Sequence, residues 1–342
     1  MHLDFEALSS DWDALADRLG AAPFLRPGWI AAWWSAFGKG ELELLTSHRG
    51  GHLQALLPVV HRRGTAASPS NWETPQFGLL STDHSSAEAI LNELFARRAD
   101  LVSVGFLRAA EPDLDELRTA AEAARYRVLV RTLVRSPFVV VQGDWRVYER
   151  ALSGNLRRDV GRCRRRLSEL GRVSLDVTYD VARLAEAFTI ERSGWKGQYK
   201  TAISSRPETA EFYTRIASWA AERGWLRLIF LRLDDRAIAF HLALEESGAY
   251  LPLKGGFDSV FRRYSPGQLI IRATLERAFS IGLKRYDFLG GFEHYKRRWA
   301  TEAHDRVLFQ AFAPTPRGLA IRAAYAYGRP LAKRVLADAR RL

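Results

Sequence analysis

The sequence predicts an α/β (α+β) protein of two tandem domains, each a mixed, mostly antiparallel sheet flanked by helices. Three observations lead to this fold class. The 342 residues suit two domains, since single hydrophobic cores rarely grow much beyond about 250 residues. Helical and strand periodicities alternate along the whole chain. Three strand patterns follow one another directly over residues 226–254, and a tight turn and a helix come next.

The charge of the chain is strongly basic, although its composition is ordinary. Hydrophobic residues make up 47% and charged residues 26% of the sequence, as in most globular proteins. The formal net charge of +12 favours anionic partners, namely nucleic acid, acidic lipid headgroups or a phosphorylated cofactor. Arginine enrichment through a GC-rich genome is the alternative that charge alone leaves open.

Several classes of protein are disfavoured by what the sequence lacks. No apolar run approaches the roughly 18 residues that a membrane-spanning helix needs. The first ten residues, MHLDFEALSS, do not show the basic and then apolar pattern of a signal peptide. Cys163 is the single cysteine, which leaves no internal disulfide and no cysteine-rich metal site. We therefore expect a cytoplasmic protein without a metal.

The first half, residues 1–143, is expected to form a mixed α/β domain. In the segment PFLRPGWIAAWWSAFG, residues 23–38, the large apolar side chains recur at three- and four-residue offsets, which predicts a helix with a wide buried face. Residues 64–86, rich in Ser, Thr, Pro and Asn, are expected to be a long loop. The other expected elements are helices near 10–19, 87–98 and 114–125, and strands near 42–47, 53–61, 101–107, 126–134 and 138–141.

The second half, residues 144–315, is expected to begin with a helix pair. The helix over 154–171 has an apolar stripe that includes Cys163, and its other face carries Arg157, Arg158, Arg162, Arg164, Arg165 and Arg166. This basic face is either solvated or in contact with phosphates or anionic lipid, and both readings stay open. The remaining expected elements are helices near 145–151, 181–192 and 208–223, and strands near 173–179, 226–233, 237–245, 248–254 and 307–312.

A basic amphipathic helix is expected at the C-terminal end, in residues 316–342. Its arginines and lysines alternate with Leu, Tyr and Val side chains. Such a helix can lie on a membrane surface or pack on the body of the protein with a solvated face, and the sequence does not choose between the two.

The stretch from Tyr264 to Trp299 is where chemistry is most expected. Ser265 suits the N-cap of the following helix and Pro266 its first position, while Gly267 lets a ligand approach the backbone closely. After the helix, a short strand is expected at 286–289 and a double glycine ends it. A helix N-terminus of this kind is a ready anion site, and an ordinary strand–turn–helix unit is the alternative.

The element order and several motifs resemble a known superfamily. The motifs are PFLRPGWIAAWWSAFG near the start, GWKG at 194–197, Ala239 in a strand followed by Leu253-Lys254, and then YSPGQLI, YDFLGG and YKRRW. Together they resemble the cellulose-biosynthesis-type acetyltransferase-like branch of the GNAT acyltransferases, over most of residues 20–312. That branch is similar to the Fem-type aminoacyltransferases, which carry two GNAT-like domains. The resemblance implies a degenerate first GNAT-like domain and a catalytic second one.

The resemblance also implies where an acyl donor binds. In GNAT proteins the loop before the central helix binds the pyrophosphate of an acyl-CoA through backbone N–H groups. The matching positions here are Arg262, Arg263, Ser265, Pro266, Gly267 and Gln268. This loop keeps a single glycine and Pro266 lacks an N–H, so we expect Arg262 or Arg263 to contact phosphate directly. Acyl-CoA is then a co-substrate, with no permanently bound cofactor.

Transfer of an acyl group to an amine requires deprotonation of the amine, stabilisation of the carbonyl oxygen and protonation of the leaving thiolate. The candidate catalytic residues are His241, Asp287, Glu293 and Tyr264, with Tyr295 as a second proton donor to sulfur. The candidate substrate-binding residues are Trp195, Lys196, Lys254, Tyr295 and Lys296. Each of these residues also has a purely structural reading, as a core, turn or salt-bridge residue.

Three functions are compatible with these features. The first is an N-acyltransferase that takes an acyl group from acyl-CoA or an acyl carrier protein to an amine in lipid, envelope or polysaccharide metabolism, such as a sphingoid-type amine in ceramide-like amide formation. An anionic membrane surface is then an expected partner, with peripheral attachment to its inner face. The second is a Fem-type enzyme that uses aminoacyl-tRNA and a peptidoglycan precursor; nucleic acid other than tRNA is not expected. The third is a non-catalytic GNAT-like scaffold of exopolysaccharide synthesis.

Overall fold

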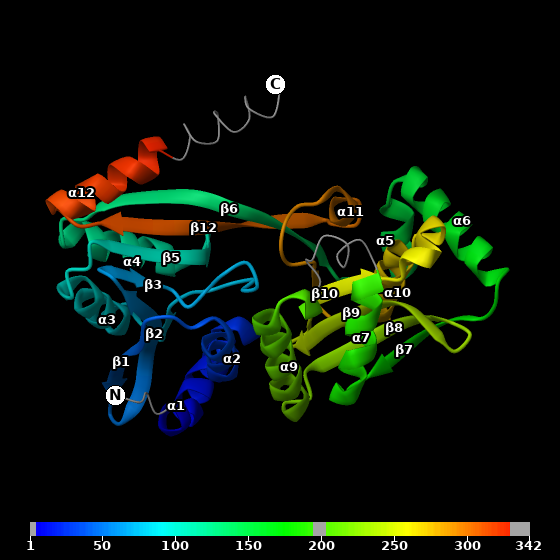
Figure 1. The fold of residues 1–342 in the computed structure, drawn as a ribbon, viewed down its shortest axis with the longest axis horizontal. Helices are drawn as coiled ribbons and strands as arrows, with labels where there is room; N and C mark the ends of the chain where they lie inside the picture. The colour runs from blue at the N-terminus through cyan, green and yellow to red at the C-terminus, as the bar shows by residue number, and fades with distance from the viewer. Residues whose placement is uncertain (1–4, 194–202, 329–342) are drawn as a thin grey trace. The chain divides into compact units, whose positions relative to one another are not determined.

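The computed structural model describes residues 5–193 and 203–328, and its chain folds into two compact units (Figure 1). Unit 1 comprises Met1–Trp34, Gly38–Leu133 and Asp305–Leu342, and unit 2 comprises Ser35–Phe37 and Val134–His304. Each unit is a mixed sheet flanked by helices, which confirms the predicted α/β (α+β) class. The chain passes from unit 1 to unit 2 at Val134, before the expected boundary at 143, and returns at Asp305.

The sheet of unit 1 contains strands β1 to β6 and β12. Their bounds are Glu41–Arg49, His52–Arg62, Thr65–Ala67, Leu80–Ser81, Leu101–Arg108, Arg127–Val140 and Glu302–Phe312. The strand order is β1-β2-β3-β5-β12-β6, and β4 pairs with β2. β3 and β5 run parallel, whereas β1 and β2 form the predicted antiparallel hairpin. β12, which was expected to be the last strand of the second half, thus lies mostly in unit 1.

The helices of unit 1 are α1 (Phe5–Arg18), α2 (Pro27–Phe37), α3 (His84–Ala96), α4 (Pro112–Ala123) and α12 (Pro316–Ala323). Trp29, Ile30 and Trp33 of α2 are buried, as the aromatic spacing predicted. α2 begins at Pro27, as predicted, and a 3-10 turn at Pro23–Leu25 precedes it. The expected loop at 64–86 contains β3 and β4, since each forms a few backbone pairs with β2.

One predicted break in the chain is absent. We expected two strands, at 126–134 and 138–141, with a break that includes Pro137, a residue without an N–H to donate. The structure has a single strand, β6, and the carbonyl of Pro137 accepts a hydrogen bond from the Phe288 N–H at 3.1 Å. The Pro137 carbonyl is therefore hydrogen-bonded to the neighbouring chain segment, and β6 continues to pair with β11 through residues 138–140.

Unit 2 is built on a sheet with the order β6-β11-β10-β9-β8-β7. The bounds are Arg285–Asp287 for β11, Ala249–Phe257 for β10, Arg236–Glu246 for β9, Leu226–Leu233 for β8 and Val173–Thr178 for β7. The pairs β7–β8, β8–β9 and β9–β10 are antiparallel, as predicted for three consecutive strands, and β10–β11 is parallel.

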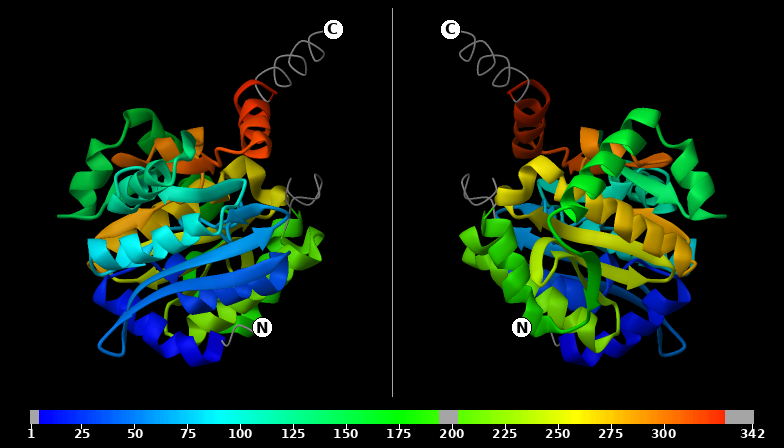
Figure 2. Two further views of the ribbon diagram at one scale, coloured as in Figure 1. Left: turned by 90° about the vertical axis from the view of Figure 1, so that its left-hand side faces the viewer. Right: turned by 90° about the vertical axis from the view of Figure 1, so that its right-hand side faces the viewer.

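Helices cover both faces of this sheet (Figures 1 and 2). On one face, α5 (Trp145–Ala151), α6 (Gly154–Ser168) and α10 (Pro266–Ser280) share a buried core with Ala239, Ala243 and Tyr250 of the sheet. On the other face, α7 (Leu184–Ser193) lies beside Phe240 and Gly256, and α9 (Pro207–Glu222) contacts β8. Cys163 is buried in the first of these cores, as its place on the apolar stripe of α6 predicted.

The C-terminal segment is described only to residue 328. α12 ends at Ala323 and a π-helical turn, Ala324–Gly328, follows it. The rest of the expected basic helix at 316–342 lies outside the described residues. Among the described residues, no helix is both long and apolar enough to cross a lipid bilayer.

Candidate functional site

The parallel strands β10 and β11 separate after two residue pairs. Ala249 pairs with Arg285 and Tyr250 with Tyr286, and the ladder ends there. On its other side, β10 stays paired with β9 as far as Phe257. β11 ends at Asp287, so this carboxylate stands where the two strands part.

The N-terminus of α10 lies next to the far end of β10. A Cβ placed on Gly267 would stand 3.3 Å from Cδ1 of Phe257, the last residue of β10. Pro266 occupies the first helical position, as predicted. The N–H groups of Gln268 and Leu269 both donate to the carbonyl of Ser265, at 2.9 and 3.2 Å. The Gly267 N–H has no hydrogen bond to any described residue and remains for a ligand.

Ser265 does not cap the helix in the expected manner. It is the N-cap residue, but its hydroxyl accepts no hydrogen bond from the first turn. Its φ of 50° and ψ of 50° place it in the left-handed region, which few non-glycine residues adopt. Strain of this kind persists only where the surrounding structure enforces it, and it often marks a functional turn.

The side chains around this turn fall into exposed and buried sets. Arg262 and Arg263 are exposed, so both are available to an anionic ligand. Tyr264 is only 8% exposed and belongs to the core under α10, with the Arg263 guanidinium 4.8 Å from its ring centre. Gln268 accepts a hydrogen bond from Nε1 of the buried Trp299 at 2.9 Å. This hydrogen bond therefore holds the turn at Gln268 next to Trp299.

Asp287 is buried and held in a fixed orientation. It is 3% exposed, and its Oδ1 accepts a hydrogen bond from the Leu289 N–H at 2.9 Å. Nε2 of His304 lies 3.4 Å from Oδ2, and the His304 ring stacks on Phe138 with centroids 5.1 Å apart. His304 could not be predicted as a site residue, because a lone histidine in a strand 17 residues after Asp287 gives no local signal in the sequence.

The turn after β11 brings three candidate residues together. Lys296 donates to the Leu289 carbonyl at 3.0 Å and forms an ion pair with Glu293, also at 3.0 Å. Lys296 therefore closes the turn that follows Asp287. Tyr295 is 45% exposed, and partial burial, with the nearby Glu293 charge as a second cause, raises the pKa of its hydroxyl to about 12. The Tyr295 hydroxyl is thus protonated at neutral pH and can donate a proton.

His241 lies under α10 and is 7% exposed. Its Nδ1 is 3.2 Å from the hydroxyl of Tyr250, whose ring packs on Tyr286 with centroids 4.8 Å apart. A Cβ on Gly255 would stand 2.9 Å from Cδ2 of His241, so glycine at this position makes room for the imidazole. Two adjacent glycines in a strand signal such a close approach, so Gly255-Gly256 was the feature of the sequence from which it could have been predicted.

Lys254 and His241 lie on opposite faces of the sheet. Directly paired residues share a face, and Lys254 pairs with Leu242 whereas Gly255 pairs with His241. The Lys254 ammonium lies 5.0 Å from the centre of the Tyr213 ring, on the face of α7 and α9. The structure therefore does not bring Lys254 to His241. Trp195 and Lys196 lie outside the described residues.

No cluster of three or more metal-ligating side chains occurs within residues 5–193 and 203–328. What these residues form instead is a strand junction with a buried carboxylate, a helix N-terminus with one open N–H, and exposed arginines one turn before it. Such an arrangement suits a reaction that needs an anion-bearing donor and a base.

Comparisons with known proteins place these features in a family context. Residues 154–297 match the family model described as an acetyltransferase (GNAT) domain; the match runs from the first residue of α6 through β11 to the turn after it. No curated protein matches the chain significantly.

Solved structures with similar folds cover nearly the whole chain. The C-terminal domain of a putative lysylphosphatidylglycerol synthetase from Agrobacterium fabrum shares 11% identity at a TM-score of 0.57, with 94% of this chain and 96% of that chain covered. FemX shares 10% identity at 0.60, with 90% and 96% covered. A tandem GNAT protein from the clavulanic acid biosynthesis pathway shares 12% identity at 0.50, with 92% and 97% covered. At these identities the similarities establish the fold, and they confirm the predicted tandem GNAT-like architecture with Fem-like relatives.

Proposed function

We propose that this chain, which belongs to the GNAT superfamily through the domain at residues 154–297, is an N-acyltransferase that moves an acyl group from a thioester to an amine. The observation that carries the proposal is the separation of β10 from β11 directly before the buried Asp287. A strand edge that loses its partner offers N–H and C=O groups to an extended ligand. A carboxylate at the point of separation can accept a proton from an amine that meets such a ligand.

The donor is an acyl-CoA or the acylated arm of an acyl carrier protein. Both carry a thioester on an arm with amide groups, which can lie along β10 beyond Leu251. The phosphate end of the arm would then reach the Gly267 N–H and the exposed Arg262 and Arg263. Backbone N–H groups at a helix N-terminus and arginines are the donors that phosphates prefer in proteins.

The chemistry assigns one role to each group. Asp287 accepts a proton from the neutral amine as the amine nitrogen forms a bond to the thioester carbonyl carbon. The carbon–sulfur bond breaks and the thiolate leaves with the electron pair. Tyr295 is the proposed proton donor to sulfur, since its hydroxyl group is partly exposed, whereas Tyr264 is buried in the core. Glu293 and Lys296 hold the turn that carries Asp287 and Tyr295.

The acceptor is proposed to be an amine in lipid or envelope metabolism, with a long-chain, sphingoid-type amine as the specific case. The positive net charge of the chain supports this acceptor, because it favours binding to an anionic membrane surface. A cytoplasmic enzyme attached peripherally to the inner face of the membrane would meet both a soluble thioester and a lipid amine.

A second candidate donor is an aminoacyl-tRNA. Two structural similarities favour this donor, one to FemX and one to the lysylphosphatidylglycerol synthetase domain, and each covers at least 90% of this chain. They favour an aminoacyl-tRNA donor as much as the similarity to the tandem GNAT protein favours an acyl-CoA donor. An aminoacyl ester and an acyl thioester both present an activated carbonyl carbon, so the same Asp287 would serve either reaction.

Ligand-induced thermal stabilisation separates these donors. A ligand that binds only the folded protein raises the melting temperature with its concentration. We expect acyl-CoA to stabilise the protein and charged tRNA to have no effect. Stabilisation by aminoacyl-tRNA alone would establish the second candidate, and no shift with any acyl-CoA, acyl carrier protein or tRNA would contradict both and favour a scaffold.

A further inference from the structure

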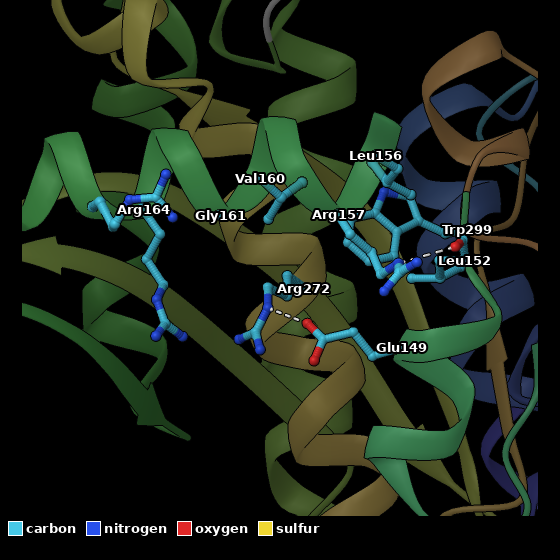
Figure 3. A pocket seen from close by; sticks show the side chains of 10 residues that line it. Glu149, Leu152, Leu156, Arg157, Val160, Gly161, Arg164, Arg272 and Trp299 are labelled. Carbon is cyan, nitrogen blue, oxygen red and sulfur yellow. Dashed lines mark hydrogen bonds and ion pairs between the residues drawn. The ribbon is translucent and has the colours of Figure 1, made fainter. Parts of the chain in front are cut away.

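A cavity lined by arginines lies between α5, α6 and α10, on the side of α6 that faces α10 (Figure 3). Its volume is about 270 Å³. It is separate from the turn with Asp287, and the proposed acyl transfer assigns it no role. The lining residues are Glu149, Leu152, Leu156, Arg157, Val160, Gly161, Arg164, Arg165, Arg272 and Trp299.

The positive charges of α6 at this cavity are not neutralised. The helix carries six arginines and a single acid, Asp159, which pairs with Arg162 and Arg298 outside the cavity lining. Arg164 and Arg165 form no ion pair with any described residue. Within the described part of the chain, the Arg157 guanidinium donates only to the Leu152 carbonyl, at 3.2 Å. Three like charges around one cavity raise its potential, and an anion would lower it.

The fourth arginine is already occupied. Nε of Arg272 donates to Glu149 at 2.8 Å (Figure 3), and its Nη1 donates to Glu276 at the same distance. Its guanidinium also lies 5.3 Å from the centre of the Trp145 ring. Arg272 and Glu149 therefore form a fixed wall, and the three arginines of α6 are the groups that can turn toward a ligand.

The cavity is apolar as well as basic. Leu156 and Val160 are buried in the core, and the buried Trp299 closes the end near the first turn of α10 through its hydrogen bond to Gln268. A fully ionic ligand would leave this surface uncovered, and a hydrocarbon would leave the arginines unpaired. A ligand with a phosphate next to an apolar chain satisfies both. The volume lies just below the roughly 300 Å³ at which sites for whole small molecules begin, so it suits a headgroup-sized fragment.

We propose that the cavity between α6 and α10 is a binding site for a phosphate group attached to an apolar chain, as in an anionic phospholipid. Arg157, Arg164 and Arg165 would bind the phosphate, and Leu152, Leu156, Val160 and Trp299 would contact the first carbons of the chain. The site does not depend on which acyl donor the protein uses.

Titration calorimetry with dihexanoylphosphatidic acid, below its micelle concentration, tests the proposal on the full chain. We expect saturable binding that weakens as salt is added, because the ion pairs are partly exposed. In Arg164→Gln/Arg165→Gln we expect binding about tenfold weaker or more, since each lost charge-assisted contact removes roughly that factor. The matched control is Arg158→Gln/Arg166→Gln, which removes two exposed arginines of the same helix that do not line the cavity.

A second variant tests the location of the site by shape. A Cβ on Gly161 would meet only Nη1 of Arg165, at 3.8 Å, so Gly161→Phe can fill the cavity without a backbone clash. Replacing a helical glycine also favours the helix, so the variant should fold. We expect Gly161→Phe to abolish binding. Unchanged binding in Gly161→Phe, or equal losses in the two double variants, would overturn the proposal.

Two further probes identify the source of the phosphate. Inorganic phosphate and coenzyme A carry phosphate without a hydrocarbon chain beside it. We expect both to bind at this site more weakly than dihexanoylphosphatidic acid by about tenfold or more, because the apolar contacts are missing. If coenzyme A binds as tightly and loses affinity in the same variants, the site serves a soluble phosphate and the lipid assignment is wrong.

Discussion

Nε2 of His304 lies 3.4 Å from Oδ2 of Asp287, and both side chains are largely buried. Asp287 ends β11, and His304 lies in β12, 17 residues later in the chain. The Leu289 N–H donates to Oδ1 and the imidazole lies beside Oδ2, at the place where β10 and β11 part. We propose that His304 is a positioning residue for the proposed base.

Asp287→Asn should lower kcat/KM by about 10²–10⁴-fold, the usual contribution of a general base. The amide oxygen can still accept the Leu289 N–H, so the turn should keep its structure. The rate of amide formation and the melting temperature check this together. Glu276→Gln, which removes an exposed carboxylate on α10, is the control and should leave the rate unchanged. A rate within a factor of about two of the wild type in Asp287→Asn would exclude Asp287 as the base.

Gly267→Asp should abolish donor binding while the protein remains folded. An acidic side chain in the first turn is favourable to the helix itself. The same charge repels the phosphates of an acyl-CoA at the open N–H. Gly267→Ala is the matched control: its Cβ, 3.3 Å from Phe257, adds the steric contact without the charge. Calorimetry with a non-hydrolysable acyl-CoA analogue checks both variants, and full affinity in Gly267→Asp would contradict the donor site.

His241→Ala should affect stability more than turnover. The imidazole is buried beneath α10 and bound to Tyr250, so its removal leaves a cavity and an unpaired hydroxyl, at a cost of about 1–3 kcal/mol. Urea unfolding and steady-state kinetics check the two effects on the same sample. A loss of turnover as large as that in Asp287→Asn, without a loss of stability, would instead make His241 the base.

Glu245→Ala should destabilise unit 2 by about 3 kcal/mol. The Glu245 carboxylate, with 8% of its side chain exposed, pairs with Arg227 of β8 and Arg277 of α10. Removing it leaves two largely buried guanidinium groups without their counter-ion. Glu222→Ala, at an exposed position with no ion pair to any described residue, is the control for loss of a carboxylate. Equal urea midpoints for the two variants would contradict a structural role for this triad.

Asp113→Asn should remove a pH dependence of stability that arises in unit 1. Oδ1 of Asp113 is buried without a hydrogen-bond partner among the described residues, and burial raises the pKa of this carboxyl from 3.8 to about 7. The folded state then binds the proton more tightly than the unfolded state. The stabilisation is complete below pH 3.8, declines as the pH rises, and is lost above about pH 7.

The melting temperature of Asp113→Asn relative to the wild type should therefore rise from pH 4 to about 7 and stay constant above that. Taking the difference between the two proteins at each pH cancels the titration of all other groups. A difference that is flat from pH 4 to 8 would show that the carboxyl titrates at its ordinary pKa.

Features that depend on neighbours in the sequence could be predicted, and features that depend on distant pairing could not. The strands β8 to β10 and the helix from Pro266 follow from local periodicity and from the Ser-Pro-Gly turn. The return of the chain to unit 1 at Asp305 depends on long-range strand pairing, which leaves no local pattern. The continuous strand β6 was missed for the same reason, because the partner of Pro137 lies 151 residues away.

The same distinction applies to the site. Asp287 and Gly267 could be identified because they stand at the ends of predicted elements. His304 could not, since its role depends on a contact between two strands. Lys254 was predicted to bind the substrate, and a bulge between Pro252 and Lys254 sets the register that places it on the face of the sheet opposite His241. The cavity at α6 depends on helix–helix packing, and the arginine run predicted its charge but not its shape.

Amine-dependent release of free coenzyme A from an acyl-CoA tests the central claim most directly. Purified protein is mixed with acyl-CoA of several chain lengths, with and without a long-chain amine, and the thiol and the amide are both quantified. We predict release that requires the amine, yields one amide per thiol and is lost in Asp287→Asn. Absence of amide formation across acyl lengths and amines, with an intact and folded protein, would contradict the assignment as an acyl-CoA-dependent N-acyltransferase.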